Sequence, residues 1–200
     1  VIIADEDFMI GGRLNAENYY VDEKHGSDWA RDAAEELKSF SNVRLLTRTT
    51  IIGAFDHGIY GAVERVSDHV AVPSPGKPRQ ILWRIYSKQS VLCAGATERS
   101  MVFENNDRPG IMLAGSMRAY VNRWAVTPHM DVAIFTNNSD GHQTAQALVK
   151  KGVNVVAVID TRVEKIVSTD YEVFTNACVS NTYGRLGLQS IEITLEDGTK

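Results

Sequence analysis

The sequence predicts an α/β fold, because strand-like and helix-like runs alternate along both halves of the chain. In the second half, a strand-like run at 131–135, a helix-like run at 141–151 and another strand-like run at 153–159 follow one another. Such a strand–helix–strand unit is expected to pair its strands in parallel through a right-handed crossover. In the first half, the branched apolar run at 1–4 leads through acids to Gly11-Gly12, which is typical of a buried strand that ends in a loop.

The composition is that of an ordinary globular protein. Of the 200 residues, 44% are hydrophobic and 23% are charged, which is enough apolar material for one large core or two small ones. The net charge of -4 provides no basic surface, so no nucleic-acid partner is expected. No apolar stretch approaches the roughly 20 residues that span a bilayer. Acids at 5–7 also interrupt the first apolar run as they would not in a signal peptide, so we expect a cytoplasmic protein without a membrane partner.

The first half is expected to form a helix and several strands. Ser27 precedes acids and an apolar-periodic run that ends at Leu37, which predicts a helix of about 12 residues capped by the serine hydroxyl. Further strands are predicted at 43–46, 49–55, 60–66, 80–86 and 90–93. The turn residues at 56–58 make a hairpin of the strands on either side, and the proline-rich stretch 72–78 is expected to be an exposed loop. We expect the runs at 1–4, 43–46 and 90–93 to share one sheet, with the helix against it.

The second half begins with a turn cluster at 105–110, and the run at 112–124 has helical periodicity. The strand–helix–strand unit described above follows this helix. After it, residues 185–195 are expected to form a strand, and Glu196-Asp197-Gly198 has the residues of a hairpin turn.

Cysteines and histidines give no sign of a metal site or a nucleophile. Cys93 and Cys178 are far apart in apolar contexts without a C-x-x-C pair, so both are expected to be buried, reduced thiols. The histidines have no ligand spacing and are expected to be surface or turn residues: His25, His57, His69, His129 and His142. Because G-x-S-x-G is also absent from the sequence, we expect no catalytic residue and no metal ligand in this chain.

The acid that ends the first strand is a candidate for nucleotide binding. In a dinucleotide-binding unit, an acid at the end of the second strand bonds the adenosine ribose hydroxyls. Residues 1–4 resemble that strand and Asp5 resembles its acid, although this feature alone favours a strand that simply ends in a solvated carboxylate. Gly11-Gly12 and the later Ala94-Gly95-Ala96 strengthen the nucleotide interpretation, because the three features occur in an order that resembles the pyridine nucleotide-disulfide oxidoreductase family.

A narrower resemblance extends over nearly the whole chain. It is carried by ADEDF with GGRL (4–8, 11–14), RTTI (48–51), YGAVER (60–65), RQILWRI (79–85), AGATER (94–99) and FENNDRPG (103–110). These strings resemble the alpha subunits of heterotetrameric sarcosine oxidases, and the last two strings are quite specific. The resemblance implies that the following residues bind NAD: Asp5 and Glu6 at the adenosine ribose, Asp7 and Arg13 in the same pocket, the backbone of Ile51 at the adenine, and Gly12 and Gly95 in the glycine segments.

The resemblance also implies a fold and a function. The fold would be two Rossmann-like FAD/NAD(P)-binding domains, at 1–123 with a β-hairpin insertion and at 124–200. Both would be incomplete. The first would lack the glycine-rich turn expected before Val1 and its own closing segment, which in this family follows the second domain, and the second would be incomplete at its end. This region would bind NAD, whereas FAD and FMN would sit elsewhere in a complex with beta, gamma and delta subunits. The complex would oxidatively demethylate sarcosine to glycine, pass the one-carbon unit to tetrahydrofolate and form hydrogen peroxide. We expect the isolated segment to be inactive and free of flavin.

The second strand–helix–strand unit has a degenerate nucleotide motif. Aligned with G-x-G-x-x-G, residues 136–141 keep only Gly141. Asn138 would obstruct the approach of pyrophosphate and Asp140 would repel it, so this unit is expected to be kept for structure. If it did bind nucleotide, Asp160 and Arg162 would lie near the ribose. Two alternative functions stay open: an NADH-dependent flavin reductase module, which would need an intact second glycine motif, and a structural interaction module with a vestigial pocket.

Overall fold

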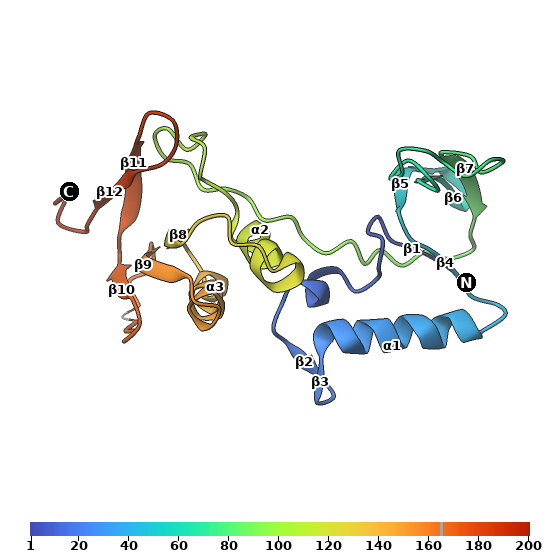
Figure 1. The fold of residues 1–200 in the computed structure, drawn as a ribbon, viewed down its shortest axis with the longest axis horizontal. Helices are drawn as coiled ribbons and strands as arrows, with labels where there is room; N and C mark the ends of the chain where they lie inside the picture. The colour runs from blue at the N-terminus through green and yellow to red at the C-terminus, as the bar shows by residue number, and fades with distance from the viewer. Residues whose placement is uncertain (165) are drawn as a thin grey trace. The chain divides into compact units, whose positions relative to one another are not determined.

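The computed structural model describes residues 1–164 and 166–200. The chain forms two compact units. Unit 1 comprises Val1–Asn15 and Tyr19–Ala96, and unit 2 comprises Ala16–Asn18 and Thr97–Lys200. Figure 1 shows the helices and strands of both units in chain order. Within the described residues, no helix is long and apolar enough to cross a membrane.

Unit 1 starts with a short parallel sheet. β1 (Ile2–Ala4) pairs in parallel with β4 (Arg44–Leu46). Between them lie the 3-10 helix η1 (Gly12–Asn15), the small hairpin of β2 (Tyr20–Val21) and β3 (Lys24–His25), and helix α1 (Gly26–Ser39), which contacts β4. The apolar run at the start of the sequence thus forms a strand that is followed by a helix and a parallel partner, as predicted.

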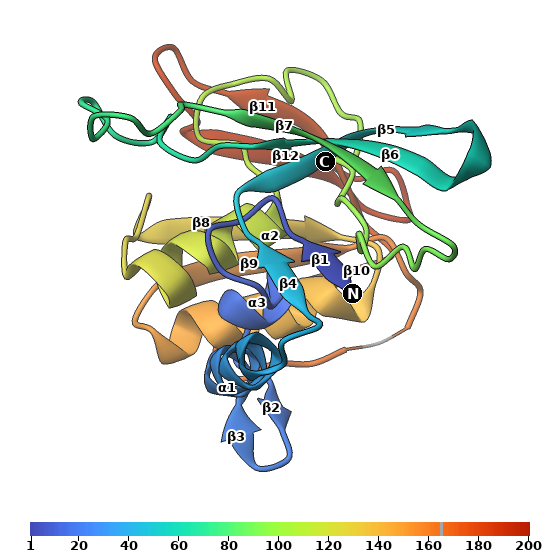
Figure 2. The same ribbon diagram turned by 90° about the vertical axis from the view of Figure 1, so that its right-hand side faces the viewer.

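An antiparallel sheet follows in unit 1. β5 (Thr49–Phe55), β6 (Ile59–Glu64) and β7 (Ile81–Tyr86) pair in the order β5-β6-β7 and form a twisted ribbon in Figure 2. Ala62 in the central strand is fully buried and lies opposite Trp83. At the β5–β6 turn, Gly58 has a φ of +71°, and a Cβ there would collide with the carbonyl oxygen of Ser87, so the turn requires glycine. The predicted hairpin is therefore present, and no strand occurs in the proline-rich stretch 72–78.

Two predictions for unit 1 are wrong. Residues 90–93 do not form a strand, and Val91 and Leu92 are 87% and 91% exposed, because no strand of the described chain pairs with them to complete a hydrogen-bonded ladder. The sheet with β1 accordingly has two strands. Helix α1 begins at Gly26 with His25 at its N-cap position, and Ser27 lies inside the first turn, where its Oγ is 2.9 Å from His25 Nδ1. Ser27 therefore does not cap the helix.

Unit 2 is built on the predicted strand–helix–strand unit. β8 (Asp131–Thr136) and β9 (Asn154–Asp160) pair in parallel through helix α3 (Ser139–Lys150), and β10 (Glu172–Thr175) adds a third parallel strand in the order β10-β9-β8. One face of α3 packs on the sheet, where Ala145 and Leu148 join Ile134, Val155 and Val158 in the main core. The periodicity of the sequence predicted this unit correctly.

Glycine 141 lets α3 approach β8 closely. A Cβ at this position would collide with the side chain of Thr136 at the end of the strand. Close packing of helix on strand is the role of the third glycine of a dinucleotide-binding turn. The one glycine that the degenerate motif keeps is therefore explained by packing.

The rest of unit 2 comprises a helix and a hairpin. Helix α2 (Ala114–Arg118) continues into a π-helical turn, η3 (Ala119–Arg123), within the predicted helix 112–124. β11 (Cys178–Tyr183) and β12 (Ser190–Thr194) form an antiparallel hairpin. Arg108 of the turn cluster donates to the carbonyl oxygen of Gly184 and, at 3.4 Å, to Thr182 Oγ1. Arg108, within the string at 103–110, thus holds this hairpin by hydrogen bonds. These bonds support a structural role for the string.

Both cysteines are exposed, so the prediction of buried thiols is wrong. Cys93 lies in the irregular segment that follows β7. Cys178 begins β11, and its neighbour Val179 faces the core, so strand alternation turns Cys178 outward. An apolar sequence context did not distinguish the two faces of this strand.

Candidate functional site

The carboxyl end of β1 leads into a loop that is fixed between β4 and β5. The N–H of Asp5 donates to Leu46 O at 2.9 Å, and Asp5 O accepts the N–H of Thr49 at 2.8 Å. The half-buried carboxylate of Asp5 uses Oδ1 to accept the N–H of Asp7 at 2.9 Å. The backbone therefore holds Asp5, Glu6 and Asp7 together at the end of the strand.

A hollow of about 320 Å³ lies beside this loop. It is lined by Glu6, Asp7, Phe8, Arg48, Arg65, Asp68 and His69. The N–H of Arg48 donates to Asp7 O at 2.7 Å, and Arg65 Nη2 donates to Glu6 O at 3.2 Å. Sequence reasoning predicted the two acids, but it gave no role to the other lining residues, because the arginines reach the hollow only through the pairing of β4, β5 and β6.

The other predicted residues of unit 1 do not line this hollow. Gly11 has a φ of +126°, and a Cβ on it would lie 2.8 Å from Ala30 Cβ, so this glycine lets the loop pass close to α1. Gly12 and Arg13 begin η1 and are exposed. Ile51 is 45% exposed on β5, and Gly95 lies in the exposed irregular segment. Their proposed contacts with a nucleotide stay predictions.

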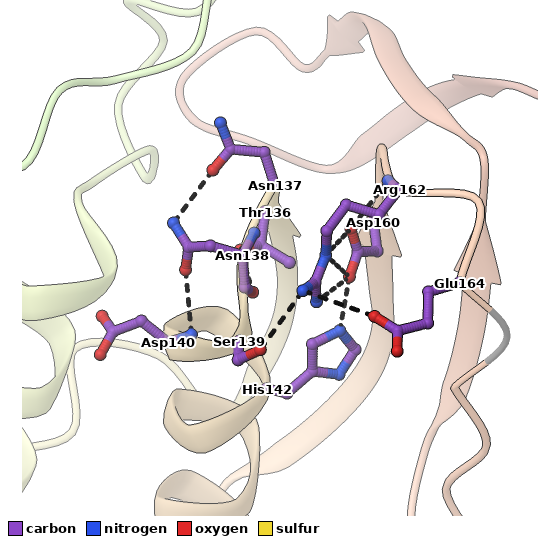
Figure 3. A network of polar contacts seen from close by, with 9 residues as sticks. All are labelled: Thr136, Asn137, Asn138, Ser139, Asp140, His142, Asp160, Arg162 and Glu164. Atoms are coloured by element: carbon purple, nitrogen blue, oxygen red, sulfur yellow. Dashed lines mark hydrogen bonds and ion pairs between the residues drawn. The ribbon is translucent and has the colours of Figure 1, made fainter.

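The carboxyl end of β9 is a closed polar network. Asp160 is fully buried, and Arg162 donates to its Oδ1 from the backbone N–H at 2.9 Å and to its Oδ2 from Nη2 at 2.8 Å. Nε2 of His142, on α3, lies 2.7 Å from Asp160 Oδ2, as Figure 3 shows. Burial raises the pKa of Asp160, but the hydrogen bonds from Arg162 and His142 outweigh it and lower the pKa to about 2.

The N-terminus of α3 is also satisfied by the protein itself. Asn138 is the N-cap, and its side chain accepts the N–H of Asp140 at 2.9 Å (Figure 3). The Asp140 carboxylate receives both terminal nitrogens of Arg118, at 3.0 and 2.7 Å. Arg118 is 3% exposed and also lies 3.3 Å from Glu17. Asp140, which the sequence suggested would repel phosphate, is thus paired with a buried arginine.

His142 departs from the prediction that the histidines are surface or turn residues. It is 7% exposed on the buried face of α3, three residues before the fully buried Ala145. That helical spacing was the available signal for its burial. Among the described residues there is no group of three or more His, Cys, Asp and Glu side chains that could hold a metal ion.

Comparison with known sequences identifies relatives of the chain. No protein-family model matches the sequence. Sarcosine oxidase subunit alpha of Rhizobium meliloti (strain 1021) is 43% identical over 96% of this chain, and that of Corynebacterium sp. (strain U-96) is 38% identical over 91%. The chain is homologous to a segment of sarcosine oxidase subunit alpha. It spans 20% of the length of each of these two relatives.

Solved structures share the fold of this chain. The chain aligns with L-proline dehydrogenase from P. horikoshii at a TM-score of 0.70 and 19% identity, covering 100% of this chain and 34% of that one. It aligns with Lactococcus lactis thioredoxin reductase at a TM-score of 0.68 and 13% identity, covering 99% and 64%. These likenesses show that the chain shares a mixed α/β fold with these two proteins.

Proposed function

We propose that this chain is the NAD-binding segment of a sarcosine oxidase alpha subunit. In the complete complex, sarcosine would be demethylated oxidatively to glycine, with tetrahydrofolate as one-carbon acceptor and hydrogen peroxide as product. FAD and FMN would be held elsewhere in an assembly with beta, gamma and delta subunits. The observation that carries the proposal is Asp5, which stands at the carboxyl end of β1 in a parallel strand–helix–strand unit, beside a hollow.

The surroundings of Asp5 suit a ribose ligand. Its Oδ1 accepts one backbone N–H, and the rest of its acceptor capacity remains for hydroxyl donors. Glu6 is exposed on the same loop and can bind the second hydroxyl, while Asp7 and Arg13 would complete the pocket. The backbone of Ile51 would meet the adenine, and Gly12 and Gly95 would let the chain approach the nucleotide closely.

The alternative of a flavin reductase module requires a second nucleotide site at the β8–α3 turn. There, Asn138 occupies the position of the second glycine, and Asp160 is surrounded by Arg162 and His142. These contacts favour a structural role for unit 2. A purely structural module remains the competing hypothesis for the whole chain, and such a module would release no nucleotide on denaturation.

Substitution of Asp5 in the complete alpha subunit tests the proposal. A charged hydrogen bond contributes about 1.5–3 kcal/mol, so Asp5→Ala is expected to raise the Kd for NAD about tenfold to a hundredfold by calorimetry. Asp56→Ala is the matched control, because Asp56 is an exposed acid at the other end of β5, and its Kd should equal the parent value. An Asp5→Ala subunit with unchanged affinity, or a parent that binds no NAD, would refute the ribose assignment.

A further inference from the structure

The chain leaves unit 1 for three residues directly after the loop that is proposed to bind NAD. Unit 1 contains Val1–Asn15 and resumes at Tyr19, whereas Ala16–Asn18 belong to unit 2. The loop that begins at Asp5 and contains Arg13 therefore ends in a segment whose contacts lie in the other unit. The proposed nucleotide contacts leave this short segment without a role.

The segment Ala16–Asn18 is held in unit 2 by an ion pair and a backbone hydrogen bond. Glu17 is 5% exposed, and its Oε1 lies 3.3 Å from Nη2 of Arg118. Asn122 Nδ2 donates to the carbonyl oxygen of Ala16 at 2.9 Å. Removing one partner of a buried ion pair is strongly destabilising. The segment is therefore released only when a buried ion pair breaks.

Arg118 is itself fixed within unit 2. It is 3% exposed, and its two terminal nitrogens donate to the two carboxylate oxygens of Asp140 at 3.0 and 2.7 Å. A guanidinium that is paired with a carboxylate at two points has a defined orientation. The preceding residue, Met117, belongs to the main core of the unit. Arg118 thus holds Glu17 from a fixed position on α2.

The loop on the other side of the segment is a compact turn. Asn15 is 8% exposed, and its Nδ2 donates to the carbonyl oxygen of Ile10 at 3.2 Å. A Cβ on Gly11 would lie 3.0 Å from the same nitrogen, so the Asn15 amide packs against the loop backbone. The next residue is Ala16, the first residue of the segment held in unit 2. The loop is therefore fixed at one end by β1 and at the other by the Glu17–Arg118 ion pair.

We infer that Glu17 is a positioning residue for the nucleotide loop, and that its ion pair with Arg118 couples NAD binding in unit 1 to the stability of α2 in unit 2. The inference rests on the proposed function, which places NAD against the residues of this loop. Glu17 acts through the loop and not on the ligand. Because coupling between two sites is reciprocal, an ion pair that favours binding of NAD is in turn stabilised by NAD.

Calorimetry with NAD on the complete alpha subunit in its complex tests the effect on affinity. Ordering the backbone of one residue changes an equilibrium constant by about tenfold. Glu17→Leu removes the acceptor and should raise the Kd for NAD by about that factor. Glu17→Gln keeps an oxygen that accepts from Arg118, so its Kd should stay within about threefold of the parent value.

Hydrogen exchange on the same proteins separates positioning from a purely structural role. In the parent, saturating NAD should slow exchange of the α2 amides by up to about tenfold, the factor set by reciprocity. In Glu17→Leu, NAD should slow exchange in the loop at 5–15 but not in α2. If Glu17 only stabilised unit 2, its loss would speed exchange of α2 equally with and without NAD, and the effect of NAD on α2 would persist.

Two further variants guard against general damage to the fold. Glu35→Leu is the matched control, because it makes the same substitution in an ion pair with Lys38 whose side chains are 66% and 56% exposed, and it should bind NAD as the parent does. Asn122→Ala removes the hydrogen bond to Ala16 but leaves the ion pair in place, and it should raise the Kd for NAD by about threefold.

The outcomes distinguish this inference from the proposed function. If the parent binds NAD and Glu17→Leu binds it equally tightly, the positioning role is refuted while the proposed function stands. The same conclusion follows if NAD slows exchange of α2 to the same extent in the parent and in Glu17→Leu, or in neither. A parent that binds no NAD refutes the proposed function, and the positioning role with it.

Discussion

Unit 1 and unit 2 each contain a strand that leads into an aspartate, and the two carboxylates have opposite surroundings. Oδ1 of Asp5 accepts the backbone N–H of Asp7, two residues on, at 2.9 Å. Oδ1 of Asp160 accepts the backbone N–H of Arg162, also two residues on and at the same 2.9 Å. Each aspartate thus makes the same side-chain-to-backbone hydrogen bond two residues along the chain. However, Asp5 is only half-buried beside a hollow, whereas Asp160 is fully buried under Arg162 and His142.

The difference arises from the side chain two residues after each aspartate. An acid at that position, Asp7, cannot pair with the carboxylate, so Asp5 keeps acceptor capacity for a ligand. An arginine there, Arg162, reaches back and occupies the carboxylate of Asp160. An aspartate at the carboxyl end of a parallel strand can therefore either stand beside an open hollow or be held in an internal ion pair.

The largest expected effect is on the stability of unit 2. Asp160→Ala leaves the buried His142 and the Arg162 guanidinium without their acceptor, and breaking a buried ion pair costs about 3–5 kcal/mol. We expect the free energy of opening for the β8 and β9 amides to fall by about 3 kcal/mol, as measured by hydrogen exchange on the complete subunit.

A matched control for this change is Glu164→Ala. Glu164 lies 4.0 Å from the same Arg162, but its side chain is 74% exposed, so less than about 1 kcal/mol is expected. Equal exchange in the two variants would show that Asp160 does not stabilise unit 2.

Acid should weaken the same network by a smaller amount. The pKa of Asp160 is lowered from 3.8 to about 2, because the hydrogen bonds from Arg162 and His142 outweigh the effect of burial. A carboxyl with a lowered folded-state pKa contributes stability that is complete above pH 3.8 and is lost as the pH falls through about 2. Protection of the β9 amides should therefore decline across this window in the parent. In Asp160→Asn, the protection of the β9 amides should not decline across this window. Parallel pH profiles for parent and variant would show that ionised Asp160 does not stabilise β9.

Local periodicity predicted most of the fold, because it reflects which face of an element is buried. The strand–helix–strand unit around α3 and the hairpin of β5 and β6 were found this way. β10 and β11 were missed. In β11, Asn181 and Thr182 interrupt the apolar pattern. The run at 90–93 has the composition of a strand, but pairing depends on a partner elsewhere in the chain, which composition does not reveal.

The candidate site was predictable only where its residues are adjacent in sequence. Asp5, Glu6 and Asp7 follow a strand and could be found from it. Arg48 and Arg65 come to the same loop through backbone hydrogen bonds with Asp7 and with each other. Those bonds join positions far apart in the sequence, and a single sequence does not reveal which distant residues meet.

The smallest effect concerns how the helix of each unit begins. In unit 2, the side chain of Asn138 accepts the N–H of Asp140 at 2.9 Å and so satisfies a free donor in the first turn of α3. In unit 1, no side chain caps α1, and Ser27 contacts the ring of His25 instead. Loss of an N-cap side chain costs about 1 kcal/mol. Asn138→Ala should therefore speed amide exchange in the first turn of α3 about fivefold, whereas Ser27→Ala should change exchange in the first turn of α1 by less than about twofold. A larger effect for Ser27→Ala would show that Ser27 caps α1, as the sequence predicted. Equal effects would show that the two helices do not differ in N-terminal capping.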